Sequence, residues 1–281
     1  MASLSLSTSK LSSLYALSAD FRRTPTMPAL FVGHGHPMNT LLDNAFTQRL
    51  KKMSGAFETP QAILVVSAHW ETRGTYVSTN PLPKTIYDFG RFDDRLFKLR
   101  YEPKGHPQLA QEVIELVQST SVQADPNMGL DHGTWTILRF LYPKQDIPVF
   151  QLSMDRSRDG QALYQLGQEL KPLRKKGVLI IGSGNIVHNL RLMDWHNIDA
   201  KPADWNLEFD QQVKDLLQKR AFNRLINYHS LGASAQLSVP TEDHYRPMLF
   251  TLGLADQKDA LQQLFEGYQY GGISMRCFQI G

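Results

Sequence analysis

The feature that most constrains this fold is the apolar run from Ala62 to Ala68, which ends in His69 and Trp70. The length and β-branched content of the run are typical of a strand. The run lacks the alternation of apolar and polar residues that is expected of a strand with one solvent-exposed face. We therefore expect a strand that is buried on both faces. The end of such a strand holds a side chain rigidly. A polar imidazole at that position contributes little to the packing of an apolar core. The run thus predicts a polar site at the end of a core strand.

Two further stretches repeat this design, an apolar run that ends in small and polar residues. Residues 29–33 lead into His34, and residues 178–182 lead through serine, glycine and asparagine towards His188. Ligand sites in open α/β sheets lie beyond the carboxyl ends of the strands. We therefore expect His34, His69 and His188 to share one site, where the glycines and serines beside them allow close approach of the backbone.

Apolar runs of strand length alternate with helical patterns along most of the chain. Strands are expected at 29–33, 61–68, 75–79, 147–153, 177–181 and 272–280, and helices at 37–53, 107–119, 134–142, 159–173, 204–219, 222–228 and 248–254. This alternation predicts an α/β fold with a largely parallel or mixed central sheet flanked by helices. We expect a single three-layer domain over residues 27–281, with a long loop of aromatic and charged residues at 81–94.

Residues 1–26 differ in composition from the domain that follows. They are rich in serine, leucine and alanine, and they hold adjacent Arg22 and Arg23 but a single acid, Asp20. A plastid or mitochondrial transit peptide has such a composition, and so does a disordered or surface-packed extension. We favour the simple extension.

Composition excludes several classes of protein. Hydrophobic residues make up 42% and charged residues 20% of the 281 residues, as in ordinary globular domains. A net charge of +3 gives no reason to expect nucleic acid or a membrane surface as partner. The single cysteine, Cys277, permits neither an intrachain disulfide nor a thiolate metal cluster, which fits a reducing compartment. We expect a cytoplasmic monomer or small homo-oligomer.

Several further polar residues are candidates for the same site. His132 precedes a helical pattern, where it could act as acid or base, or where Asp131 could simply cap the helix. His244 stands in a similar position beside two acids. His36 would share a face with the histidine two positions earlier if the chain is extended there, and Asn189 could donate a hydrogen bond to a substrate. One such histidine alone is more often a core or surface residue, but their recurrence favours a metal site, because neutral imidazole binds zinc and iron.

Five blocks of sequence carry a resemblance to a known family. They are Gly33–Asn39, Ser67–Trp70, Asp131–Gly133, Ser183–Leu190 and Glu242–Pro247. In this order the blocks resemble the class III extradiol ring-cleavage dioxygenases, and in particular the bacterial 4,5-DOPA dioxygenase branch. The resemblance covers nearly all of the chain from residue 27 onward. It departs at position 36, where a small residue such as serine is expected in place of histidine.

The resemblance implies a role for each histidine of these blocks. It makes His34, His69 and His244 metal ligands, the last in the place of a carboxylate ligand used by a related branch. His188 would serve as acid and base, or lie close enough to be a fourth ligand. His132 would bind substrate or transfer protons, a task for which histidine side chains are suited.

The implied reaction is extradiol cleavage of a catechol by O₂, with 4,5-cleavage of L-DOPA or a related catechol. Such chemistry needs one divalent metal that can change its oxidation state, so we expect Fe(II). Several histidines would also bind Zn(II) well. Glu242 or Asp243 could supply a carboxylate ligand only if the adjacent His244 turns away. Arg246 is the candidate partner for the substrate carboxylate.

The alternative function is a zinc-dependent hydrolase or amidase on the same scaffold. Zinc-bound water would attack a carbonyl group there, with His132 or His188 as the base. A structural or storage zinc module fits less well, because structural zinc sites tend to be local and rich in thiolates.

Overall fold

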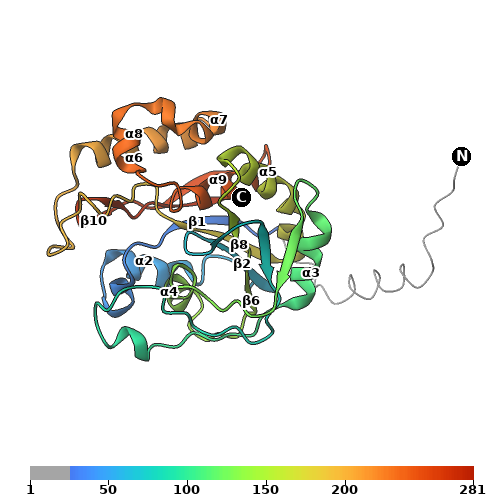
Figure 1. The fold of residues 1–281 in the computed structure, drawn as a ribbon. Coiled ribbons are helices and arrows are strands. Elements are labelled where there is room, and N and C mark those ends of the chain that lie inside the picture. Colours follow the sequence, from blue (N-terminus) through green and yellow to red (C-terminus); the bar gives the residue numbers. More distant parts are fainter. Residues whose placement is uncertain (1–25) are drawn as a thin grey trace, which may run out of the picture.

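A six-stranded mixed sheet forms the centre of the molecule (Figure 1). In sheet order the strands are β6 (Val149–Gln151), β2 (Ala62–Ser67), β8 (Val178–Gly184), β1 (Ala29–Gly33), β12 (Cys277–Ile280) and β9 (Leu261–Phe265). The first four are parallel, β12 is antiparallel to β1, and β9 is antiparallel to β12. This confirms the predicted fold class. The computed structural model describes residues 26–281, and the extension predicted at the N-terminus lies outside these residues apart from Thr26.

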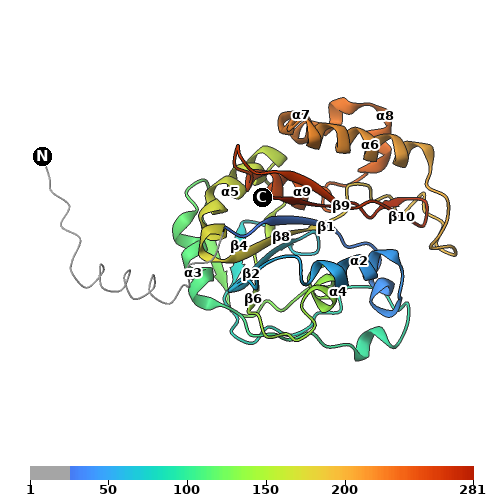
Figure 2. The same ribbon diagram turned by 180° about the vertical axis from the view of Figure 1, so that it is seen from behind.

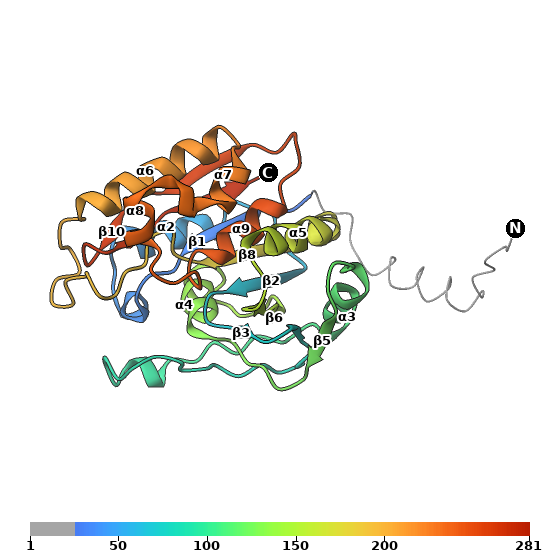
Figure 3. The ribbon, with the colours of Figure 1, turned by 45° about the horizontal axis from the view of Figure 1, so that its top comes forward.

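Helices cover both faces of the sheet, α2 and α4 on one side and α5 and α9 on the other (Figures 1 and 2). The α-helices are α2 (Ala45–Met53), α3 (Pro107–Leu116), α4 (His132–Leu141), α5 (Gly160–Leu170), α6 (Asp204–Gln218), α7 (Phe222–Ile226), α8 (Ala233–Ser238) and α9 (Arg246–Gly253). Figure 3 shows α6, α7 and α8 grouped together on the side of α9. Within residues 26–281, none of the helices has both the length and the apolar character needed to cross a membrane.

Short elements complete the fold around this framework. Three two-stranded pairs lie outside the central sheet: β3 (Glu71–Thr72) with β7 (Met154–Asp155), β4 (Thr75–Ser78) with β5 (Val122–Asp125), and β10 (Tyr268–Gln269) with β11 (Ile273–Ser274). The 3₁₀ helices are η1 (Pro37–Leu41), η2 (Leu96–Lys98), η3 (Lys171–Lys176) and η4 (Tyr228–Leu231).

The central strand β2 is buried on both faces, as its unbroken apolar run predicts. Leu64 and Val66 pack in the apolar cluster that includes α5 and α9, whereas Ile63 and Val65 pack in the cluster that includes α2 and α4. Burying one large aliphatic side chain contributes about 1.5–3 kcal/mol relative to leaving it exposed. The two clusters therefore hold the strand, and the residues at its end, firmly in place.

The carboxyl ends of β1, β2 and β8 lie side by side, as the sequence predicts. Gly33 pairs with Gly184, and Ser67 pairs with Ser183, both in parallel register. The chain before α9 packs directly against the same strand ends. The two backbones are so close that a Cβ atom at Gly184 would lie only 2.1 Å from the carbonyl oxygen of His244. The fold thus brings a segment distant in sequence onto the ends of these three strands.

Three predicted elements differ from the structure. The predicted helix 37–53 is two helices, η1 and α2, because Asn44 and Thr47 form a capping box that starts α2. The predicted strand 272–280 is divided into β11 and β12. The strand predicted at 75–79 exists as β4, but it pairs with the unpredicted β5 and not with the central sheet.

Candidate active site

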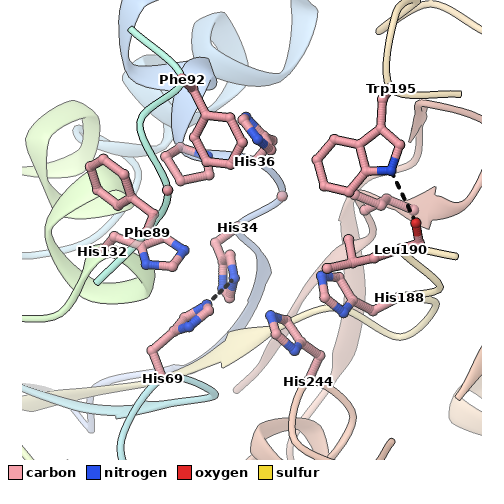
Figure 4. Close-up of a pocket in the computed structure, with 14 residues that line it drawn as sticks. His34, His36, His69, Phe89, Phe92, His132, His188, Leu190, Trp195 and His244 are labelled. Atoms are coloured by element: carbon pink, nitrogen blue, oxygen red, sulfur yellow. Dashed lines mark hydrogen bonds between the residues drawn. The ribbon is translucent and has the colours of Figure 1, made fainter. Parts of the chain in front are cut away.

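Five histidines from separate segments line one cavity at the carboxyl end of the sheet (Figure 4). They are His34 after β1, His69 after β2, His132 at the start of α4, His188 after β8 and His244 before α9. The cavity has a volume of about 180 Å³. Since a protein cavity of about 150 Å³ can hold a benzene molecule, there is room for one aromatic ring beside the histidines.

Two hydrogen bonds through Ser183 set the orientation of His34. The hydroxyl of Ser183 donates to the carbonyl oxygen of Gly133 over 2.6 Å. The same Oγ is then left to accept from Nδ1–H of His34, which lies 3.0 Å away. Neutral His34 therefore carries its proton on Nδ1, and the lone pair of Nε2 faces the cavity.

His34 and His69 direct their Nε2 atoms at each other over 3.1 Å. Nδ1 of His69 lies 3.5 Å from the carboxylate of Asp88, which favours a proton on that nitrogen. The two Nε2 lone pairs then repel each other unless a cation lies between them. Two nitrogens 3.1 Å apart could both contact one metal ion at the usual bond length of about 2.1 Å. The pair therefore fits two adjacent positions around one metal ion.

His244 supplies a third nitrogen to this group. Its Nδ1 donates to the carboxylate of the adjacent Asp243, which leaves Nε2 for the cavity. One nitrogen from each of His34, His69 and His244 lies within 4.8 Å of the other two. An oxygen partner behind each ring is typical of metal-binding histidines, because it fixes the tautomer and orients the ring. Asp243 thus acts as a hydrogen-bond partner of His244, whose ring stays directed at the cavity.

His188 lies against His244 instead of completing the same group. The two rings stack with their centroids 3.5 Å apart and their planes at 11°. Possible ligand atoms of His188 cluster with Asp243 and His244, and within residues 26–281 no such cluster joins His188 to His34 and His69. The nitrogens of His34, His69 and His244 therefore form one close group, with His188 beside them.

His132 lies on the other side of the cavity. It is held there by Asp88, which the sequence analysis did not single out. The carboxylate of Asp88 accepts the backbone N–H of His132 over 2.9 Å and contacts Nδ1 of the ring over 2.9 Å. Asp131 caps α4, as the simpler alternative predicted, by accepting from Thr134 N–H over 3.0 Å. The predicted loop 81–94 is present in the structure. It places Asp88 beside His132, a contact that the sequence alone does not show.

Burial determines the protonation of the cluster. Burial, followed by the neighbouring imidazoles, lowers the pKa of His34, His69 and His188 well below the usual 6.5. These rings are therefore neutral at pH 7, and the neutral imidazole is the form that binds a metal or accepts a proton. Burial opposes ionisation of Asp243, but its hydrogen bonds with His244 and Thr241 and the neighbouring imidazoles together outweigh this effect, and the pKa of Asp243 is lowered.

His36 does not share a face with His34, because the chain between them is not extended. Gly35 has a φ of 62°, and His36 instead caps η1 by accepting from Met38 N–H over 3.2 Å. The His36 ring packs edge-on against Phe92 with centroids 4.2 Å apart. Figure 4 shows it beside Phe92 and across from Trp195. Burial lowers the pKa of His36 to about 4, so this ring is neutral at pH 7, and it packs among the rings of Phe92, Trp195 and Tyr270.

The two residues predicted to bind substrate, Arg246 and Asn189, direct their side chains to other partners. Neither residue lines the cavity. The guanidinium of Arg246 donates to Glu71 over 2.9 Å and to two backbone carbonyl groups over 2.6 and 2.8 Å. Nδ2 of Asn189 donates to the carbonyl oxygen of Leu237 over 2.7 Å. Both side chains are used to hold neighbouring backbone segments in place.

Comparison with known proteins agrees with this arrangement. Residues 26–278 match the family described as the catalytic LigB subunit of aromatic ring-opening dioxygenase. The chain belongs to this family. The resemblance to the class III extradiol dioxygenases is thereby confirmed, and the chain is an extradiol dioxygenase, an oxidoreductase of a metal-dependent family.

Curated relatives and a solved structure extend the match over most of this dioxygenase. It is 42% identical to the 4,5-DOPA dioxygenase extradiol of Escherichia coli (strain K12), over 91% of this chain and 95% of that protein. It is 34% identical to the 4,5-DOPA dioxygenase extradiol of Beta vulgaris, over 89% of this chain and 94% of that protein. A crystal structure of an uncharacterized protein from Escherichia coli K12 aligns with a TM-score of 0.79 and 40% identity, covering 91% of this chain and all of that one.

The first prediction concerns metal binding by the dioxygenase. We expect His69→Ala to lose most of its bound metal, because the substitution removes one of three converging nitrogens. Metal content measured by elemental analysis after gel filtration tests this. His196→Ala, at an exposed position, is the matched control and should bind metal as the unmodified protein does. Full metal content in His69→Ala would remove His69 from the ligand set.

Proposed function

We propose that this dioxygenase cleaves a catechol ring with O₂, and that the substrate is L-DOPA, opened by 4,5-cleavage, or a related catechol. The observation that carries the proposal is the convergence of three imidazole nitrogens beside a cavity with room for one aromatic ring. The names of the relatives, 4,5-DOPA dioxygenase extradiol, support L-DOPA as the first substrate to test.

We propose that His34, His69 and His244 hold one divalent metal, Fe(II) in the active enzyme. Bound there, Fe(II) would supply redox chemistry and open positions for the two catechol oxygens and O₂. Each of the three rings has an outer partner that holds it in place, so the site would bind the ion with little rearrangement. Zn(II) would suit the same nitrogens, but it has no accessible redox change.

His188 is the proposed acid and base. Its ring lines the cavity beside His244 and is neutral at pH 7 because burial lowers its pKa. It can therefore accept a proton from a catechol hydroxyl and return it as the ring opens. His132, on the opposite side of the cavity in Figure 4, is the second candidate for proton transfer.

Apolar side chains form the remaining wall of the cavity and would hold the substrate ring. Phe89, Phe92, Leu190, Trp195 and Ile273 lie around it. Phe92 and Trp195 are nearly parallel, with 16° between their rings and 6.5 Å between centroids. Such a wall suits the faces and edges of an aromatic ring.

The second prediction tests the reaction itself. Protein reconstituted anaerobically with Fe(II) should consume O₂ and form a yellow ring-cleavage product when L-DOPA is added. The zinc-loaded protein should form none, because zinc has no accessible redox change. An oxygen electrode and a visible spectrum measure both signals. Failure with Fe(II), together with zinc-dependent hydrolysis of esters or amides, would replace this proposal with the hydrolase alternative.

The third prediction separates proton transfer from metal binding. We expect His188→Ala to retain its metal and to lose about 10²–10⁴-fold in kcat, the usual contribution of a general acid or base. Steady-state kinetics and elemental analysis measure the two properties on the same sample. His229→Ala, an exposed histidine, is the control. Loss of metal in His188→Ala would instead make His188 a fourth ligand.

A further inference from the structure

Asp88 is not among the three residues proposed to hold the metal, and it does not line the cavity, but its carboxylate lies within 4.8 Å of a nitrogen of His69 and of His132. One carboxylate oxygen accepts the backbone N–H of His132 over 2.9 Å, and the other lies 2.9 Å from Nδ1 of the same ring. The second oxygen is also 3.5 Å from Nδ1 of His69. Asp88 therefore stands behind two histidines of the cavity and contacts His132 most closely.

The backbone around Asp88 is fixed on both sides. Ile86 N–H donates to the carbonyl oxygen of Leu130 over 2.8 Å, and its own carbonyl accepts from Nε1–H of Trp135 over 2.9 Å. On the other side, the Phe89 ring meets the His132 ring edge-on, at 90° with centroids 5.4 Å apart. The carboxylate is thus held at His132 by packing as well as by its own hydrogen bonds.

We propose that Asp88 is a positioning residue that sets the tautomer of His132. The backbone N–H of His132 can only donate, so it takes one carboxylate oxygen. The other oxygen of a carboxylate can only accept, so Nδ1 of His132 must carry the proton. The lone pair of His132 then lies on Nε2, where it can accept a proton or a hydrogen bond from a substrate hydroxyl. The catalytic part of this inference rests on the proposed function, whereas the tautomer does not.

Asp88→Asn reverses this arrangement with almost no change in shape. The amide oxygen is needed by the backbone N–H of His132, so the amide NH₂ faces the ring. Because NH₂ can only donate, Nδ1 must become the acceptor and the proton moves to Nε2. In serine proteases the same type of substitution produces the wrong histidine tautomer and lowers kcat by about 10⁴-fold.

The fourth prediction is that Asp88→Asn lowers kcat for L-DOPA cleavage by about 100-fold or more, with KM changed less than about threefold and metal content retained. Asp94→Asn is the matched control on the same loop, because its carboxylate pairs with Arg91 at the surface. Asp88→Glu, which keeps a carboxylate, should recover part of the lost kcat. An unchanged kcat in Asp88→Asn would overturn the proposal, and loss of metal would show that Asp88 acts through His69 instead.

A spectroscopic readout decides the tautomer without relying on activity. Nitrogen-15 NMR of the full-length, zinc-loaded protein should show the His132 proton on Nδ1, and on Nε2 in Asp88→Asn. The His132→Gln variant identifies the signal. If no catechol is cleaved by any form, the proposed function fails, and this spectrum still tests Asp88. The same tautomer in both proteins would contradict the inference.

Discussion

The proposed site depends on the close approach of imidazole nitrogens from three separate segments of the chain. Nε2 of His34 and Nε2 of His69 are 3.1 Å apart, and a nitrogen of His244 lies within 4.8 Å of both. Lone pairs at such distances repel each other in a low-dielectric site, and a bound cation turns that repulsion into ligation. The fold maintains the arrangement with an oxygen partner behind each ring: Ser183, Asp88 and Asp243.

That arrangement follows from the sheet. Three parallel strands end at one edge in matching register, so the residues after β1 and β2 emerge as neighbours. The absence of a side chain at Gly184 lets the His244 backbone close against β8. Burial then lowers the pKa of His34, His69 and His188 and keeps these rings in the form that binds metal or accepts protons. Core packing, strand register and proton chemistry thus support the same site.

The sequence predicted the parts of this site that follow from local patterns. Unbroken apolar runs located β1, β2 and β8, and their polar ends placed His34 and His69 together. The roles of Arg246 and Asn189 were predicted from chemical type and from their places beside His244 and His188, and the structure uses both side chains for backbone hydrogen bonds. Asp88 was missed because no local pattern distinguishes an aspartate in a loop until tertiary folding brings it to His132. The break between η1 and α2 was missed because a capping box overrode the apolar periodicity.

The most direct test of the account is X-ray absorption spectroscopy of the metal-loaded protein. Three imidazole ligands should appear, with metal–nitrogen distances of about 2.0–2.1 Å for zinc. The scattering from the outer atoms of the rings identifies imidazole and counts it. Three histidine ligands would support the proposed set of His34, His69 and His244. A metal bound by one imidazole or none, with oxygen ligands in their place, would contradict it.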